Sequence, residues 1–257
     1  MAKKTSTIAI AQRLQELDLF GFDSRMLSNL LNLGKVQTSN LLRRMEEENL
    51  VARVEAGKYL LLGFSPERVL SNPLFVGCHL AHPAYVSFWS ALHYYGFTEQ
   101  VPGTVFLATT RKKPPLTFRQ MRFRFVLVKP AMFWGYHRQS SPELPIVVAD
   151  EAKAILDSLL FPQYAGGIGE VAKALKNGLA SLDIPTLVEY ANHLSSPSMC
   201  SRLGFLLDTL GATFDDLIIA KGPVNLDPQR PRAGIYNSRW RVYVNVPLEE
   251  LFPERVA

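Results

Sequence analysis

The chain has 257 residues, of which 47% are hydrophobic and 11% aromatic, and its 28 Lys and Arg residues outnumber 23 Asp and Glu residues. This apolar content excludes a disordered chain, and two cysteines exclude both a disulfide framework and a four-thiolate zinc site. Few cysteines and no long apolar run favour a cytoplasmic protein of one or two domains without a membrane contact. The basic start, residues 1–5, lacks the apolar segment of a secretory signal.

The first part of the chain shows the spacing of three helices. Apolar residues recur at near-helical intervals over 5–18, and Asp23 is placed to cap a second helix over about 24–32. Gly34 is expected to take a positive φ at the end of that helix. A three-residue turn then leads to a third helix over about 36–48. Short turns with a glycine join the two helices of a helix-turn-helix.

The predicted third helix has a divided surface. Leu41, Leu42 and Met45 are expected in the core, and polar and cationic side chains are expected to face outward, as base edges and phosphates require. The acidic run 46–48 would repel phosphate, so DNA contact is expected near the start of the helix. Base-edge or sugar contacts are assigned to Gln37, Thr38, Ser39 and Asn40, and phosphate contacts to Lys35, Arg43, Arg44 and Lys58.

A hairpin follows these helices. Two β-like runs, 50–54 and 59–62, flank a turn with a glycine, and Lys58 lies near its tip. The hairpin is expected to be the wing of a winged helix-turn-helix domain over 1–65. Three small helices and a hairpin also serve as dimerisation or protein-docking modules, and that alternative stays open here.

Prolines mark the next boundary. Pro66 and Pro73 interrupt the periodicity, because proline disfavours helix in the residue before it. The sequence therefore predicts a linker and domain entry over 66–84. The remaining residues, 85–257, are predicted to form a mixed α/β domain, which makes the whole chain α+β.

The second domain is expected to mix strands and helices. The aromatic stretch 85–95 is expected to be a buried helix that ends at Gly96. Strands are expected over 105–110, 122–128, 144–149 and 239–245, and helices from Asp150 and near 167–178, 183–194 and 198–210.

Charge is unevenly distributed along the second domain. Residues 100–142 hold eight basic and no acidic residues, whereas 143–220 hold four basic and ten acidic residues. A cationic block attracts polyanions, although the acidic segment could instead fold against it and neutralise it. Both interpretations stay open. The possible second polyanion surface comprises Arg111, Lys112, Lys113, Arg119, Arg122 and Arg124, of which the last two are expected on one face of a strand.

No motif identifies an active site. His79 and His82 have metal-like spacing but no further thiols beside Cys78, and Gly166-Gly167 lacks the Gly-Lys-Ser/Thr of a phosphate loop. The sequence therefore predicts no catalytic residue, no metal ligand and no cofactor, and we do not expect an enzyme.

Several segments together resemble a known family. The order of the N-terminal pattern, then YVSFWSALHYYGFTEQVP (85–102), then 105–110, is similar to that of AbiEi antitoxins, which belong to bacterial type IV (abortive infection) toxin–antitoxin systems. Residues 150–157 and 166–168, and 202–207 with Gly211, also resemble that family, so the likeness spans roughly residues 10–211. It does not extend to 221–257.

This resemblance implies an N-terminal winged helix that binds repeats in its own promoter, as double-stranded DNA, and represses the operon. It also implies a C-terminal domain that counters a nucleotidyltransferase-like toxin without a stable complex. Two other functions stay open: a ligand-responsive transcription factor unrelated to a toxin, and an enzyme that acts on nucleic acid through the 100–142 block.

Overall fold

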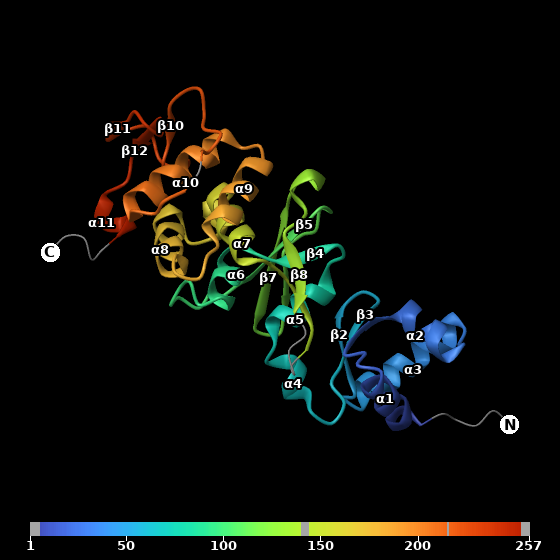
Figure 1. Ribbon diagram of the computed structural model, residues 1–257. Helices are drawn as coiled ribbons and strands as arrows, with labels where there is room; N and C mark the ends of the chain where they lie inside the picture. Colours follow the sequence, from blue (N-terminus) through green and yellow to red (C-terminus); the bar gives the residue numbers. More distant parts are fainter. Residues whose placement is uncertain (1–5, 140–143, 215, 253–257) are drawn as a thin grey trace.

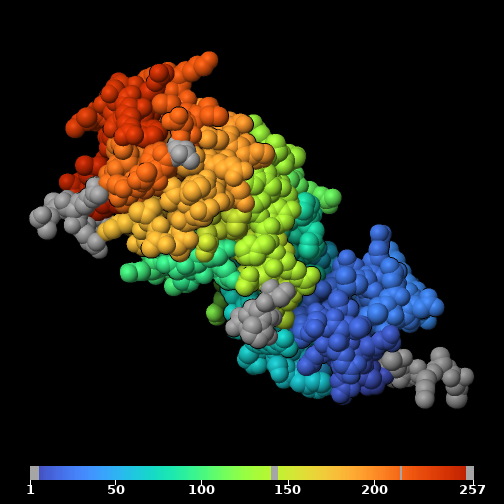
Figure 2. All heavy atoms as spheres, viewed as in Figure 1, coloured from blue at the N-terminus to red at the C-terminus, as the bar shows by residue number. Residues whose placement is uncertain are grey.

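The computed structural model describes residues 6–139, 144–214 and 216–252, which form a mixed α+β structure, as predicted (Figure 1). An N-terminal unit, residues 6–62, lies at one end of an elongated molecule, and the C-terminal segments lie at the other (Figure 2). A six-stranded sheet occupies the middle. No helix in the described ranges is both long and apolar enough to cross a membrane.

The N-terminal unit contains three helices and a three-stranded sheet. The predicted helices and hairpin are present as α1 (Thr7–Glu16), α2 (Ser24–Leu31), α3 (Lys35–Glu47), β2 (Val51–Glu55) and β3 (Lys58–Leu61). A short strand that the sequence did not predict, β1 (Gly21–Asp23), pairs antiparallel with β3, so the strand order is β1-β3-β2. Phe22 of this strand is buried opposite Tyr59, which ties the start of α2 to the hairpin.

The turn between α2 and α3 differs from the prediction. Asn32, not Gly34, takes the left-handed conformation, with a φ of 50°. Asparagine tolerates this conformation because its short polar side chain bonds locally. Gly34 instead has a φ of −70° and is the N-cap of α3. The predicted cap of α2 is confirmed, because Asp23 accepts a hydrogen bond from the backbone N–H of Met26 at 2.7 Å.

Helices occupy most of 66–84, where the sequence analysis expected a linker. These are α4 (Pro66–Leu70) and α5 (Pro73–Leu80). Both begin at proline because the first helical position has no N–H bond to lose, so the prolines mark helix starts. Gly77 lets α5 approach the sheet closely: a Cβ there would lie 3.2 Å from Leu107 and 3.3 Å from Phe123. The division of the chain into domains stays a prediction.

The central sheet has the strand order β6-β7-β5-β4-β9-β8. The pairs β5–β7 and β4–β9 are parallel and the others are antiparallel. The strands are β4 (Ala84–Val86), β5 (Val105–Thr109), β6 (Leu116–Phe118), β7 (Met121–Leu127), β8 (Tyr136–Gln139) and β9 (Ile146–Ala149).

The prediction of one helix over 85–95 is wrong. Its first residues form β4, and α6 (Phe88–Tyr94) begins only afterwards. All three residues of β4 are buried because the strand lies inside the sheet with helices on both faces. Such strands show a continuous apolar run rather than alternation, and periodicity does not separate that run from a buried helix.

The predicted C-terminal helices are confirmed as α7 (Glu151–Leu160), α8 (Ile168–Gly178), α9 (Ile184–His193) and α10 (Pro197–Leu210). Single-turn 3-10 helices span Pro130–Met132 and Pro162–Tyr164. The chain then forms a small sheet of β10 (Val224–Asn225), β12 (Val242–Val244) and β11 (Ile235–Asn237), and the short α11 (Leu248–Leu251). The predicted strand 239–245 is shorter than expected because Arg241 has a φ of 56° and leaves the extended conformation.

Candidate nucleic-acid interface

One face of α3 is exposed and mainly polar. It carries Lys35, Val36, Ser39, Asn40 and Arg43, which are all exposed. These positions follow the spacing i, i+1, i+4, i+5, i+8, so they form one stripe along the helix. The stripe begins at the N-terminus of α3, where backbone N–H groups favour anions.

Sequence reasoning missed Val36, which is 73% exposed. An apolar residue at a helix start is normally assigned to the core. Its position around the helix could have shown this. The core side of α3 is defined by the buried residues Thr38, Leu41, Leu42 and Met45, and Val36 does not fall on that side. An exposed aliphatic group among polar side chains suits a thymine methyl group in a major groove.

The core side of α3 holds the helix in place. Leu41, Leu42 and Met45 are buried, as predicted, in one cluster with Leu14 of α1 and Leu27 of α2. The exposed stripe is therefore attached to a packed helix rather than to a loop.

The expectation that Thr38 faces outward is wrong. Its side chain is 3% exposed, and its hydroxyl donates to the Gly34 carbonyl at 3.0 Å. Thr38 lies three residues before Leu41, which places it on the buried side of α3. A buried hydroxyl that already has a partner does not reach a base edge, so Thr38 is removed from the candidate interface.

Gln37 is exposed, but part of its side chain has a structural partner. Its Oε1 atom accepts from the Gly34 N–H at 2.9 Å, which caps the first turn of α3. The side-chain NH₂ group is the part of Gln37 that remains for a ligand.

The cations of α3 differ in exposure. Arg43 pairs with Glu47 at 2.8 Å, and the two side chains are 66% and 58% exposed. Exposed pairs at this spacing contribute only about 0.3–0.5 kcal/mol, so a phosphate can replace Glu47 at small cost. Arg44 is half-buried, whereas Lys35 is exposed at the first position of the helix.

Lys58 is not placed for the predicted phosphate contact. Its Nζ donates to the carbonyl of Leu80 at the end of α5, and Glu55 lies 3.8 Å away. Burial, followed by the nearby charge of Lys113, lowers the pKa of Lys58. The hairpin tip therefore contacts the rest of the chain, in agreement with its place between the helices of the N-terminal unit and the central sheet (Figure 1).

Lys113 also has its partners within the molecule. Its Nζ lies 2.6 Å from a carboxylate oxygen of Glu55 and 5.2 Å from the ring centre of Phe125. Its side chain is only 15% exposed. The predicted second polyanion surface consequently loses this residue.

The other cations of that surface are exposed: Arg111, Lys112, Arg119, Arg122 and Arg124. Arg122 and Arg124 share one face of β7, as predicted, because Phe123 and Phe125 are buried on the other. The guanidinium of Arg124 lies over the ring of Tyr164 at 5.7 Å. The last residues of the 100–142 block, 140–142, lie outside the described ranges.

The acidic segment does not form ion pairs with this block in the described ranges: no Lys or Arg of 100–139 pairs with a carboxylate of 144–214 or 216–220. Instead, Asp157 binds Lys153 and Asp208 binds Arg239. Of the block, Lys113 is paired, and its partner Glu55 belongs to the N-terminal unit. The described part of the acidic segment therefore does not neutralise the exposed arginines, which can bind another anionic partner.

The histidines do not join a metal-binding group in the part of the chain that the structure describes. Within the described residues, no group of three or more His, Cys, Asp or Glu side chains could hold a metal ion. His79 lies against β1, where a Cβ on Gly21 would come within 2.8 Å of its ring. Burial lowers its pKa to about 4, with smaller contributions from Lys58 and His82. Its Nε2 atom is buried and has no hydrogen-bond partner among the described residues.

Comparison with known proteins identifies the fold but no family. No family model matches the chain, and no curated protein matches it significantly. The structure is similar to the crystal structure of RV2827C protein from Mycobacterium tuberculosis, with a TM-score of 0.55 and 13% sequence identity. The match covers 93% of this chain and 92% of that chain. At this identity the likeness shows a shared fold alone.

Proposed function

We propose that this chain is a DNA-binding autorepressor and antitoxin of a bacterial type IV toxin–antitoxin system, with a winged helix-turn-helix as its DNA-binding part. It would bind double-stranded DNA in its own promoter and counter a nucleotidyltransferase-like toxin. The observation that carries the DNA-binding part is the exposed stripe of α3, in which Lys35, Ser39, Asn40 and Arg43 surround Val36.

The chemistry of this stripe supports a major-groove contact. Asn40 can bond an adenine edge with both atoms of its amide, and Val36 can contact a thymine methyl. Lys35 and Arg43 flank these groups at positions suited to phosphates. Recognition helices place their N-terminal residues on base edges, and this stripe begins at the first residue of α3.

The position of the hairpin restricts how DNA would bind. Because Lys58 at its tip contacts Leu80, the hairpin tip is not assigned a phosphate. The preceding helix offers an alternative, since Arg25 and Asn29 of α2 are exposed. In helix-turn-helix proteins the first helix of the pair crosses the DNA backbone, which suits a cation at Arg25.

The antitoxin part of the proposal rests on the sequence resemblance. Two of the segments that carry it, 85–102 and 150–157, are far apart in the chain but pack together in the core. Tyr85 and Ser87 both donate to the carboxylate of Asp157, at 3.0 and 2.8 Å. This contact shows that the two segments pack together in one core, which supports interpreting them together rather than as separate matches.

The test measures fluorescence anisotropy of the full chain with its own promoter duplex and with a scrambled duplex, at several salt concentrations. Promoter binding about 10³-fold tighter than scrambled binding is expected of a specific repressor. Equal, steeply salt-dependent binding to both duplexes would indicate a general polyanion surface instead. Absence of binding to both would leave α3 as a protein-docking surface and contradict the proposal.

A further inference from the structure

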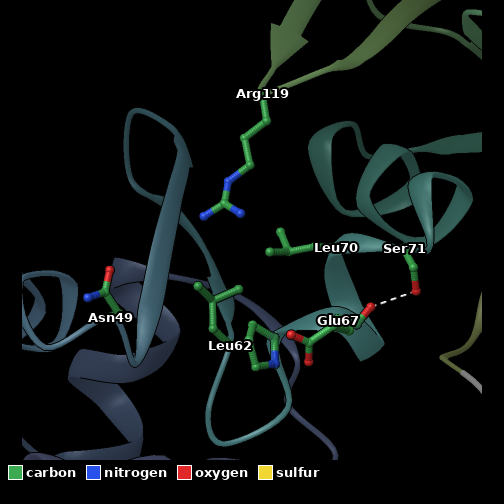
Figure 3. A pocket seen from close by; sticks show the side chains of 7 residues that line it. Asn49, Leu62, Glu67, Leu70, Ser71 and Arg119 are labelled. Carbon is green, nitrogen blue, oxygen red and sulfur yellow. Dashed lines mark hydrogen bonds between the residues drawn. The ribbon is translucent and has the colours of Figure 1, made fainter.

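A cavity of about 520 Å³ lies where the N-terminal unit meets the rest of the chain (Figure 3). Small-molecule sites in proteins have volumes of about 300–1,000 Å³. Its walls come from Asn49, two residues after the end of α3, from the end of the hairpin, from α4 and from the turn between β6 and β7. Its lining includes Leu62, Pro66, Glu67, Leu70 and Arg119.

Arg119 supplies the positive charge of this cavity. Its side chain extends from the β6–β7 turn, and its guanidinium points into the space between the hairpin and α4 (Figure 3). The guanidinium lies 5.7 Å from the ring centre of Phe118, and no carboxylate in the described ranges forms an ion pair with it. A planar group with five donors thus faces an open cavity without forming an ion pair with any described residue, including Glu67 of the same cavity.

Arg119 has a backbone conformation that large side chains rarely adopt. Phe118 pairs with Met121, so Arg119 occupies the first position of a two-residue hairpin turn, and its φ is 53°. Glycine and asparagine are favoured in such turns, because a larger side chain crowds the backbone at positive φ. Arginine has no conformational advantage at this position.

The rest of the wall favours a particular class of anion. Leu62, Leu70 and Pro66 supply apolar surface, and Glu67 adds a negative charge to the same wall. A phosphate group usually takes several cations or backbone N–H groups, and Glu67 would repel a phosphate dianion about twice as strongly as a singly charged carboxylate. One guanidinium beside an apolar wall instead matches one carboxylate joined to an aliphatic group.

We propose that this cavity binds a small organic monocarboxylate, with its carboxylate on Arg119 and its aliphatic part against Leu62 and Leu70. Such a ligand would connect the β6–β7 turn to the residues that follow α3 and β3. This binding does not depend on the proposed function, and it is measured without DNA.

The test is isothermal titration of the full chain with hexanoate and octanoate, beside hexyl phosphate and hexanol. Saturable binding of the carboxylates is expected, weaker binding of hexyl phosphate, and no binding of hexanol. NMR of labelled leucine methyl groups should place the largest shifts at Leu62 and Leu70. The decisive variant is Arg119→Asn, which removes the cation while placing a favoured residue in the turn. Its carboxylate affinity should fall about tenfold or more.

Lys112→Gln is the matched control, because it removes an exposed cation of the same block that does not line the cavity. It should bind hexanoate as the unmodified chain does. Unchanged affinity in a folded Arg119→Asn variant would overturn the proposal. So would tighter binding of hexyl phosphate, or no methyl shift with either carboxylate up to about 10 mM, well above a Kd of about 1 mM.

Discussion

Lys153 and Asp157 form an ion pair inside the core of the molecule, and both side chains are 0% exposed. They lie one turn apart on α7. The Nζ of Lys153 also donates to the hydroxyl of Tyr85 at 3.0 Å, and that hydroxyl donates to Asp157. Ser87 adds a further hydrogen bond to the same carboxylate. All four side chains are buried, so the two charges lie away from water and these groups satisfy one another by hydrogen bonds and the ion pair.

Loss of one partner of this pair should destabilise the fold strongly. We expect Asp157→Ala to lower the free energy of unfolding by about 3–5 kcal/mol, because it leaves the Lys153 ammonium buried without its counter-ion. The double variant Lys153→Met, Asp157→Leu should cost clearly less, because it removes both charges. Urea unfolding measures both changes. Arg43→Gln, which breaks an exposed pair, should change stability by less than about 1 kcal/mol. A double variant as unstable as the single one would contradict this account.

The sequence predicts α7 but not this pair. An i, i+4 Lys–Asp spacing is typical of an exposed helix face, and Lys153 lies outside the apolar stripe of Ala152, Ile155 and Leu156. The structure buries residues 152–159 without interruption, so α7 has no exposed side along that length. Burial on all sides depends on the sheet and on neighbouring helices, which local periodicity does not report.

Other differences between the predicted and the observed structure also arise from tertiary packing. Helices with one buried stripe and a clear cap, such as α2 with Asp23, were predicted almost to the residue. The strand β4 was missed because both its faces are covered. The stripe on α3 was largely predicted, but Thr38 was assigned by its chemistry rather than by its phase on the helix. Lys58 was assigned by its place in the hairpin, and only the packing of that hairpin against α5 shows its partner.

Stability should depend on pH through His79. Its pKa is lowered from 6.5 to about 4, so between these values the unfolded chain binds a proton that the folded chain does not. Stability is therefore lost as the pH falls through about 6.5 towards 4. Lys58 and His82 disfavour the charged ring, whereas Asp23 favours it, and burial is the largest cause. Urea unfolding should show a loss on the order of 2 kcal/mol between about pH 7 and about pH 4.5 that His79→Gln removes.

The control for this prediction is His93→Gln, because His93 is exposed. It should retain the full decrease in stability on acidification. If His79→Gln retained the same decrease, other groups would have to cause it.

Base reading by α3 should depend on Asn40. We expect Asn40→Ala to weaken promoter binding by about 1–3 kcal/mol and to relax specificity at one base pair. Thr38→Val is the matched control on the same helix: it should lower stability by about 1 kcal/mol through the lost bond to Gly34, without altering sequence preference. Anisotropy with single-base promoter variants separates these results. A change of base preference in Thr38→Val would instead place that residue in the interface.

Phosphate contact should distinguish Lys35 from Lys58. Lys35→Gln should weaken binding to all sequences and lower the slope of log affinity against log salt by about one. Lys58→Gln should leave that slope unchanged, since its ammonium is bound to the Leu80 carbonyl. The opposite ranking would show that the hairpin leaves α5 when DNA binds.

The exposed arginines of β7 allow a test of the second polyanion surface. If Arg122 and Arg124 contact phosphates of the same duplex, the double substitution to alanine should lower the salt slope by about two without changing base preference. Arg239→Ala, in the small C-terminal sheet region, is a control for net charge, because Arg239 is paired with Asp208. An unchanged slope in the double variant, with the same promoter affinity, would remove β7 from the DNA-binding surface. The charge of β7 would then require a different anionic partner, since the described part of the acidic segment does not pair with it.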